Sequence, residues 1–366
     1  MSAPRVLMIT PDFPPQRGGI QLLAHRIAAH LRESTVRVLT LGHAEAGPWD
    51  RREGLDVVRV AGEGSHRADV ARLNAAALRE ARRFGPDVVL CMHICVAPAA
   101  TAIRQAFRVP VLTYMYAREV AASRRLAELS VRISDRVVAI SRYTARIAED
   151  LGARRVSLIT PGVDAEPATS GSTQRLQRPT VLTVSRMTER YKGHDVMIRA
   201  LPLIRTHVPD VQWAVVGDGA LRGSLQRLAE ANGVADAVLM RGAVDDAERD
   251  RWLDTAHVFA MPSRVPAGDR AGEGFGIVYL EAGVHGLPVV AGAGGGALDA
   301  VLDGRTGRLV DPSDHVAVAG AISDLLTEPA AAARMGEAGR EHAREFAWPR
   351  IADRLQELIT ESAGRG

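Results

Sequence analysis

Residues 272–296, GEGFGIVYLEAGVHGLPVVAGAGGG, combine a glycine-rich turn, a helical segment and an apolar strand. A glycine-rich turn that runs into a helix leaves backbone N–H groups unpaired at the helix start, and these groups suit phosphate oxygens. Glu273 precedes the helix, and Glu281 lies eight positions later, more than a turn inside it. We interpret the segment as a site for a sugar-bearing nucleotide, with Glu273 at the sugar hydroxyls and Glu281 at a ribose diol.

The alternative is a buried loop whose glycines merely let two backbones approach each other. It leaves two carboxylates unexplained in an otherwise apolar segment, where an unpaired charge is costly. We therefore favour the nucleotide site.

The surrounding sequence predicts two α/β domains. A chain of 366 residues exceeds the size of one ordinary core. RVLMIT (5–10) is a continuous apolar run, typical of a buried parallel strand, and a glycine loop and a helix follow it. Strands and helices alternate to residue 165, and the alternation restarts at TVLTVSR (180–186). Each half is expected to form an open, mostly parallel sheet with helices on both faces.

We place the N-terminal domain at residues 1–167 and the C-terminal domain at 168–347, with the polar segment 168–179 as the linker. The last segment, 348–366, is expected to be a helix that crosses back to the N-terminal domain, because its apolar stripe must pack on something. The stripe consists of Ile351, Leu355, Leu358 and Ile359.

Charge is unevenly distributed along the chain. Residues 1–165 hold 24 Arg, no Lys and 16 Asp and Glu, a net charge of +8, whereas the remainder carries −5. The N-terminal half is therefore the expected place for an acidic or phosphate-bearing partner. A nucleic-acid partner is not expected, because the basic residues are scattered and only 4% of the residues are aromatic.

Lys192 is the only lysine among 46 basic residues. The ratio indicates a coding bias toward Arg, and the exception is consistent either with chance or with a site that needs a compact ammonium. TVSRMTERYKG (183–193) places Arg186 and Lys192 in a loop at the carboxyl end of a strand, where ligands of α/β sheets collect. Two such cations suit a departing diphosphate, and solvated surface residues are the alternative.

Two N-terminal segments carry further candidates. PDFPPQRGGI (11–20) places Gly18 and Gly19 just before a helix, where their amides can contact a phosphate. DVVLCMH (87–93) ends at His93, flanked by Cys91 and Cys95. Two cysteines and one histidine are too few for a zinc site, so we expect reduced structural thiols.

These motifs together resemble the retaining family 4 glycosyltransferases of the GT-B fold, close to the phosphatidylinositol mannosyltransferases. The likeness spans nearly the whole chain, and it implies two Rossmann-like domains, with the donor nucleotide in the C-terminal one and the acceptor in the N-terminal one. It is carried by RGGIQ (17–21), SRMTERYKG (185–193), VVGDG (215–219), EGFGIVYLEA (273–282) and the tryptophan-led last helix.

The resemblance implies that Arg186, Lys192 and Glu273 are the catalytic residues, with both cations on the diphosphate. It implies Gly19 on the phosphate from the other domain, Glu281 on the ribose and Val244 beside the nucleobase. The donor-binding residues expected from it are Gly18, Gly19, Arg186, Lys192, Val244, Glu273, Gly274, Phe275, Gly276, Ile277 and Glu281.

One segment departs from the family pattern. A histidine usually follows the fifth N-terminal strand, whereas TYMYARE (113–119) stands here. Tyr116 can donate a hydrogen bond to a sugar hydroxyl, but it is not the same electrostatic partner as an imidazole. Core aromatics are the alternative interpretation of both tyrosines. The acceptor-binding residues expected are Asp12, His93, Tyr114, Tyr116 and Arg118.

The expected activity is transfer of a hexose, with retention of its anomeric configuration, from a UDP- or GDP-sugar to a small-molecule or lipid acceptor. No Asp-x-Asp pair occurs in the sequence, so we expect neither a metal nor another cofactor. The leaving diphosphate itself can accept the proton of the acceptor. An epimerase or phosphorylase on the same fold and an inactive nucleotide-sugar-binding protein are the alternatives.

The segment 118–134 is expected to be a helix with Leu126, Leu129 and Ile133 on one face and arginines elsewhere, a pattern that fits contact with an anionic membrane. Glu128 interrupts the basic residues, so an ordinary surface helix is the alternative. No run reaches the roughly 18 apolar residues of a spanning helix. We expect a cytoplasmic protein with at most a peripheral membrane contact.

Overall fold

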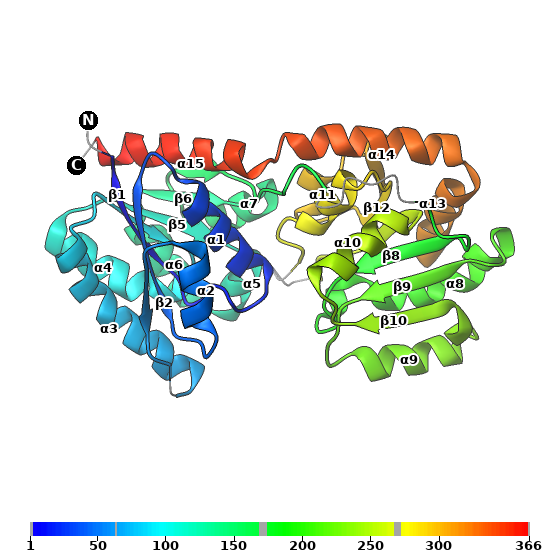
Figure 1. Ribbon diagram of the computed structural model, residues 1–366, viewed down its shortest axis with the longest axis horizontal. Coiled ribbons are helices and arrows are strands. Elements are labelled where there is room, and N and C mark those ends of the chain that lie inside the picture. The colour runs from blue at the N-terminus through cyan, green and yellow to red at the C-terminus, as the bar shows by residue number, and fades with distance from the viewer. Residues whose placement is uncertain (1–2, 63, 168–173, 267–271, 365–366) are drawn as a thin grey trace. The chain divides into compact units, whose positions relative to one another are not determined.

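The computed structural model describes residues 3–62, 64–167, 174–266 and 272–364 (Figure 1). The chain forms two compact units: unit 1 comprises Met1–Gly162 and Trp348–Gly366, and unit 2 comprises Val163–Ala347. The division thus falls at 162/163 instead of the expected 167/168. Val163 already belongs to unit 2, because its N–H donates to the carbonyl of Phe346 at 2.8 Å. Part of the expected linker, 168–173, lies outside the described residues.

Unit 1 is built on a parallel sheet of seven described strands, each paired in parallel with its neighbour. The apolar runs RVLMI and VVLC form its central strands, which are buried on both faces as expected. In sheet order the strands are β3 (Val57–Val60), β2 (Thr35–Leu41), β1 (Arg5–Ile9), β4 (Val88–Cys91), β5 (Val111–Met115), β6 (Arg136–Ala139) and β7 (Val156–Leu158).

Helices cover both faces of this sheet (Figure 1). Apolar residues of α3 and α4 share one core with alternate residues of the central strands, such as Leu7 and Val89. On the other face, α15 contacts both α1 and β4. The helices are α1 (Gly19–His30), α2 (Ala46–Glu53), α3 (His66–Phe84), η1 (Ile94–Val96), α4 (Ala97–Phe107), α5 (Ala117–Ala122), α6 (Arg124–Ile133), α7 (Arg142–Asp150) and α15 (Trp348–Ala363).

Unit 2 repeats this design with six described strands, again all parallel. Its main core joins α8, α9 and α13 to alternate strand residues, among them the fully buried Trp213. On the opposite face, Tyr279 of α11 packs edge-on against Phe259 of β11, with ring centroids 6.0 Å apart. Two Rossmann-like domains, as predicted, are thereby confirmed.

In sheet order the strands of unit 2 are β10 (Val238–Gly242), β9 (Gln212–Val216), β8 (Thr180–Val184), β11 (Val258–Met261), β12 (Val289–Gly292) and β13 (Gly307–Val310). The helices are η2 (Arg190–Lys192), α8 (His194–His207), α9 (Arg222–Ala231), η3 (Ala235–Ala237), α10 (Asp246–Thr255), α11 (Ile277–Val284), α12 (Ala297–Ala300), α13 (His315–Thr327) and α14 (Pro329–Arg344).

The prediction of a single helix over residues 118–134 is wrong. Two helices, α5 and α6, occupy the segment and break at Ser123, which has an extended backbone (φ −153°, ψ 88°). Leu126 and Leu129 pack partly against the cores of unit 1, and Ile133 is buried. The apolar stripe is therefore largely used inside the unit.

Among the described residues no single helix is long and apolar enough to span a membrane. The bent pair α13 and α14 meets the criteria for a span by length and composition alone.

The last helix, α15, packs on unit 1. Its stripe residues Ile351, Leu355 and Ile359 have no exposed surface, and Ser34 donates a hydrogen bond to the Gln356 amide oxygen at 2.8 Å. Because α15 follows all of unit 2 in the chain, unit 1 is assembled from two distant stretches of sequence.

We expect Leu355→Ala to destabilise unit 1 by about 2–5 kcal/mol, because it removes a fully buried side chain and leaves a cavity. The measurement is urea unfolding followed by circular dichroism. The matched control is Arg354→Ala at the exposed neighbouring position, which should change stability by less than about 0.5 kcal/mol. Equal effects of the two substitutions would contradict the packing of α15.

Candidate functional site

The strand order of unit 2 brings two loops together at one edge of the sheet. From the central pair β8 and β11 the chain progresses outward in opposite directions. Ligands of open α/β sheets bind at such a reversal, outside the carboxyl ends of the strands. The loop after β8 carries Arg186 and Lys192, and the segment between β11 and α11 carries Glu273. The topology thus places three predicted residues at the same edge.

Lys192 and Glu273 form an ion pair between these loops. The ammonium of Lys192 lies 2.5 Å from Oε2 of Glu273, and each side chain is only 13% exposed. Burial lowers the pKa of Lys192, but the charge and hydrogen bond of Glu273 outweigh burial, so the pKa is raised above its ordinary value. Lys192 is therefore a fixed positive charge.

Gly193 lets the two loops approach each other. Its φ is 81°, and a Cβ there would lie 2.2 Å from the carbonyl oxygen of Pro262, just after β11. The N–H of Arg264 donates to the carbonyl of Tyr191 at 2.8 Å, which ties the loops a second time. Any side chain at position 193 would separate the loops, and with them Lys192 from its partner.

The turn before α11 presents backbone amides. Gly276, its N-cap, has a φ of 89°, and a Cβ there would lie 2.4 Å from the ring of Tyr279. Phe275 is buried against Phe346, with ring centroids 5.8 Å apart. No side chain among the described residues caps the helix, so its first amides suit an anion. The predicted donor residues of this turn are Gly274, Phe275, Gly276 and Ile277.

Arg186 lies at the same edge but is not part of the ion pair. Its side chain is 63% exposed, and its guanidinium is 3.7 Å from Glu189 in the same loop. An exposed arginine retains rotamer freedom, so it can move to meet a ligand that Lys192 meets in a fixed position.

Glu281 and Val244 lie in a second group around α10. Burial raises the pKa of Glu281, and the charge of Arg249 on α10 is the largest effect opposing it. Val244 is half-buried and precedes Asp245, whose side chain caps α10. Sequence reasoning missed Arg249, because nothing in its own segment distinguishes it from other surface arginines.

His194 is a buried histidine directly behind the Lys192 loop that sequence reasoning treated only as a helix start. It is 2% exposed, and its Nε2 lies 3.0 Å from the Ser185 hydroxyl. Its Nδ1 has no hydrogen-bond partner in the described part of the chain. Burial lowers the pKa of His194 to about 4, and the charge of Lys192 lowers it as well. The imidazole is therefore neutral at pH 7.

In unit 1 the corresponding reversal lies between β1 and β4. Asp12 follows β1 and accepts a hydrogen bond from the Gln21 amide at 2.9 Å, and burial raises its pKa. Gly18 is the N-cap of α1 and Gly19 its first residue, with no side-chain cap in the described structure. Because the positions of the two units relative to each other are undetermined, contact of Gly19 with the diphosphate stays a prediction.

His93 follows β4 and pairs with Glu119, a residue that sequence reasoning missed. His93 Nδ1 accepts a hydrogen bond from the Cys95 N–H at 3.0 Å, so its Nε2 carries the hydrogen toward Glu119 Oε2, 3.2 Å away. Glu119 also accepts from the N–H groups of Ile94 and Tyr116, each at 3.1 Å. The signal was available, since a glutamate three residues after a helix N-cap is the capping-box position.

Burial controls the protonation of this pair. It raises the pKa of Glu119 to about 8 against the two backbone hydrogen bonds, which lower it. Burial also lowers the pKa of His93 to about 4, assisted by the charge of His66. The imidazole is therefore neutral at pH 7, and the site contrasts with the charged pair of unit 2.

Tyr114 and Tyr116 are stacked, with ring centroids 6.3 Å apart, and are 0% and 5% exposed. Neither hydroxyl has a hydrogen-bond partner among the described residues. A buried hydroxyl without a partner is costly, so both tyrosine hydroxyls keep unused hydrogen-bonding capacity. Arg118, the remaining predicted acceptor residue, is exposed on α5.

Cys91 and Cys95 are free thiols, in agreement with the structural role expected of them. Burial raises the pKa of Cys91 to about 12 and raises that of Cys95 as well, which disfavours the thiolate form of both. The described residues contain no group of three or more His, Cys, Asp or Glu side chains arranged to hold a metal ion.

Comparisons with known proteins identify the family. A model described as "Glycosyltransferase Family 4" matches residues 17–167, and one described as "Glycosyl transferases group 1" matches residues 168–342. The chain is 35% identical to the GDP-mannose-dependent alpha-(1-6)-phosphatidylinositol monomannoside mannosyltransferase of Mycolicibacterium smegmatis, over 97% of this chain and 98% of the relative. The chain belongs to the family 4 glycosyltransferases.

A second relative and several solved structures are also similar to the chain. A GDP-mannose-dependent monoacylated alpha-(1-6)-phosphatidylinositol monomannoside mannosyltransferase of Corynebacterium glutamicum is 32% identical, with 98% of this chain and 99% of the relative covered. Among solved structures, sucrose-phosphate synthase from Thermosynechococcus elongatus matches with a TM-score of 0.83 at 20% identity, covering 99% and 100% of the two chains. Anabaena HepE with UDP and glucose gives 0.80 at 19% identity, covering 98% and 100%. At these identities the structural matches establish the GT-B fold alone.

The chain is thus a hexosyltransferase that uses a nucleoside diphosphate sugar. Nothing in the comparisons favours the alternatives, an epimerase or phosphorylase on the same fold or an inactive binding protein.

We expect the free energy of unfolding to fall as pH is lowered from about 6.5 to about 4, in part because of His194. The pKa of His194 is lower in the folded protein than in the unfolded chain, so the unfolded chain binds more protons in this pH window. The resulting loss of stability is absent above the window and complete below it. The loss reaches about 3 kcal/mol. Urea unfolding at several pH values measures it.

His194→Gln should give a shallower pH dependence, and the slope rather than the stability at one pH is the readout. His207→Gln, at an exposed position at the end of the same helix, is the control and should retain the full slope. Identical slopes for the two variants would show that burial of His194 does not couple folding to pH.

Proposed function

We propose that this protein transfers mannose from GDP-mannose to a phosphatidylinositol mannoside or a closely similar lipid, without a metal and with retention of the anomeric configuration. The donor and acceptor follow from relatives at 32–35% identity that align over nearly the whole chain. The observation that carries the catalytic part is the buried ion pair of Lys192 and Glu273 at the strand reversal of unit 2. A lipid acceptor places the reaction at a membrane surface, which requires only peripheral contact.

In the proposed reaction, the bond between C1 of mannose and the oxygen of the β-phosphate breaks, and a bond from the acceptor hydroxyl oxygen to C1 forms on the same face. The acceptor proton passes to the leaving phosphate oxygen. Negative charge grows on the diphosphate as C1 departs. Lys192, Arg186 and the first amides of α11 stabilise that charge, and a preorganised donor of this kind contributes about 2.7–4 kcal/mol.

Glu273 has two roles in this proposal. It fixes the Lys192 ammonium through one hydrogen bond and leaves the other two ammonium hydrogens for phosphate oxygens. Its carboxylate also accepts hydrogen bonds from the mannose hydroxyls. Glu281 is assigned to the ribose and Val244 to the base. His93, Glu119 and Tyr116 are assigned to the acceptor side, where the Tyr116 hydroxyl donates a hydrogen bond to a sugar hydroxyl without the charge that an imidazole can carry.

Donor identity is tested by thermal stabilisation. GDP-mannose at about a hundred times its dissociation constant should add about 2.7 kcal/mol to the stability of the native state. UDP-glucose and dTDP-glucose at the same concentration are the comparison. Stabilisation by UDP-glucose without any by GDP-mannose would reject mannose transfer but leave hexosyl transfer intact.

The product formed with EDTA present should be an α-mannoside by NMR, and a β-product or loss of activity in EDTA would reject the proposed chemistry.

Lys192→Ala should lower kcat by about 100- to 1000-fold, because it removes a charge that stabilises the transition state. Lys192→Arg should also be strongly impaired, since a planar guanidinium does not fit a site of this low exposure 2.5 Å from a carboxylate. Arg205→Ala, at the far end of α8, is the control and should be near normal. Circular dichroism establishes that each variant is folded, and near-normal turnover of Lys192→Ala would exclude the assigned role.

A further inference from the structure

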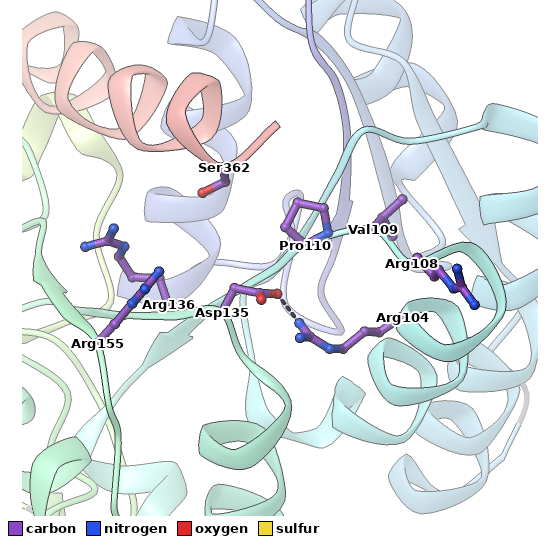
Figure 2. Close-up of a pocket in the computed structure, with 8 residues that line it drawn as sticks. All are labelled: Arg104, Arg108, Val109, Pro110, Asp135, Arg136, Arg155 and Ser362. Carbon is purple, nitrogen blue, oxygen red and sulfur yellow. Dashed lines mark hydrogen bonds and ion pairs between the residues drawn. The ribbon is translucent and has the colours of Figure 1, made fainter. Parts of the chain in front are cut away.

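A pocket of about 280 Å³ lies in unit 1, and nothing in the proposed reaction uses it (Figure 2). Pro110 precedes β5, Arg136 begins β6, Arg155 precedes β7, and all three line the pocket. Because the strands are parallel, their amino ends share one edge of the sheet. The pocket is therefore at the edge opposite to the one that carries Asp12 and His93.

Four arginines line this pocket (Figure 2): Arg104 and Arg108 at the end of α4, Arg136 at the start of β6 and Arg155 before β7. Two carboxylates oppose them. Asp135 pairs with Arg104 and also accepts a hydrogen bond from the N–H of Val111, and Glu361 of α15 lies 3.4 Å from Arg136. Within the described residues Arg108 and Arg155 have no ion-pair partner, which leaves an excess of two positive charges.

Arg108 occupies an unfavourable backbone conformation. Its φ is 56° and its ψ 25°, which makes it the only described residue other than glycine with a positive φ. It follows the last residue of α4, the helix end at which glycine is the usual residue because a Cβ is disfavoured there. Retaining an arginine at this position costs conformational free energy, and such strain points to a role for the side chain.

We propose that this pocket binds the phosphate group of a small phosphate ester. A guanidinium fork matches two phosphate oxygens, and Arg108 and Arg155, on opposite sides of the Arg104–Asp135 pair in Figure 2, each offer a fork without an ion-pair partner among the described residues. The volume, about 280 Å³, is at the lower limit of small-molecule pockets, so it accommodates a phosphate with a glycerol or sugar unit rather than a whole nucleotide. Free phosphate esters and the headgroup of an anionic glycerolipid share this chemistry. The proposal does not depend on the identity of the hexose donor.

The experiment compares two full-length variants with the same change in charge. Arg108→Gly together with Arg155→Gln alters the pocket, and Arg132→Gln together with Arg154→Gln alters exposed arginines that do not line it. One arm titrates glycerol 1-phosphate by calorimetry. The other measures cosedimentation with vesicles of phosphatidylglycerol and phosphatidylcholine, with pure phosphatidylcholine as the reference.

We expect the pocket variant to bind at least about tenfold more weakly than the wild type, and the surface variant to bind like the wild type. A difference in the glycerol 1-phosphate arm alone assigns a free phosphate ester, and a difference with anionic vesicles assigns the lipid headgroup. Equal binding by both variants in both arms overturns the proposal.

A stability measurement keeps the test independent of folding. Arg108→Gly relieves the strain, so its melting temperature should equal or exceed that of the wild type. A clear decrease would assign the Arg108 side chain a structural role and overturn the inference from its backbone. The single variant Arg155→Gln, which leaves that backbone unchanged, then decides whether the pocket binds phosphate at all.

Discussion

The ion pair of Lys192 and Glu273 is the constraint on which the site of unit 2 depends. Two charges of such low exposure are stable only with good geometry, because each has lost most of its hydration. That geometry requires neighbouring strands, a positive φ at Gly193 and a tight turn at Gly276. The glycines that stand out in the sequences of these two loops are therefore required by one salt bridge.

The pair also explains how the site exists without its substrate. In the empty site the carboxylate compensates the ammonium, so no buried charge is left alone. The positive charge is thus held in place by the protein itself. In the mechanism proposed above, the ammonium would keep this partner and offer its remaining hydrogens to the diphosphate, so little reorganisation would be needed.

Local pattern was sufficient for most of the fold and for the two loops that meet in the Lys192–Glu273 pair. Apolar runs such as RVLMIT predicted the central strands. Patterns failed where the deciding contact is distant in sequence. The partner of Glu119 comes from the loop after another strand, and the break at Ser123 leaves no proline or glycine to signal it. We did not predict α2, nor any of the elements between β12 and the last helix, namely α12, β13, α13 and α14.

The charge count illustrates a related limit. The excess of arginine in the N-terminal half was real, and it suggested an anionic partner without indicating which end of the sheet would meet it. At the carboxyl edge, His93 is neutral and two tyrosine hydroxyls are buried. Four arginines instead gather at the amino edge. Only the strand order, which sequence does not state, separates these two environments.

The return of α15 to unit 1 reverses the usual order of assembly during synthesis. Domains generally fold as they leave the ribosome, beginning with the N-terminal one. Here unit 2 is one uninterrupted stretch and has all of its sequence before α15 is made. The part of unit 1 that packs on α15 lacks this cover throughout that interval. The nascent chain is therefore most exposed to aggregation just before translation ends, when unit 2 is already complete.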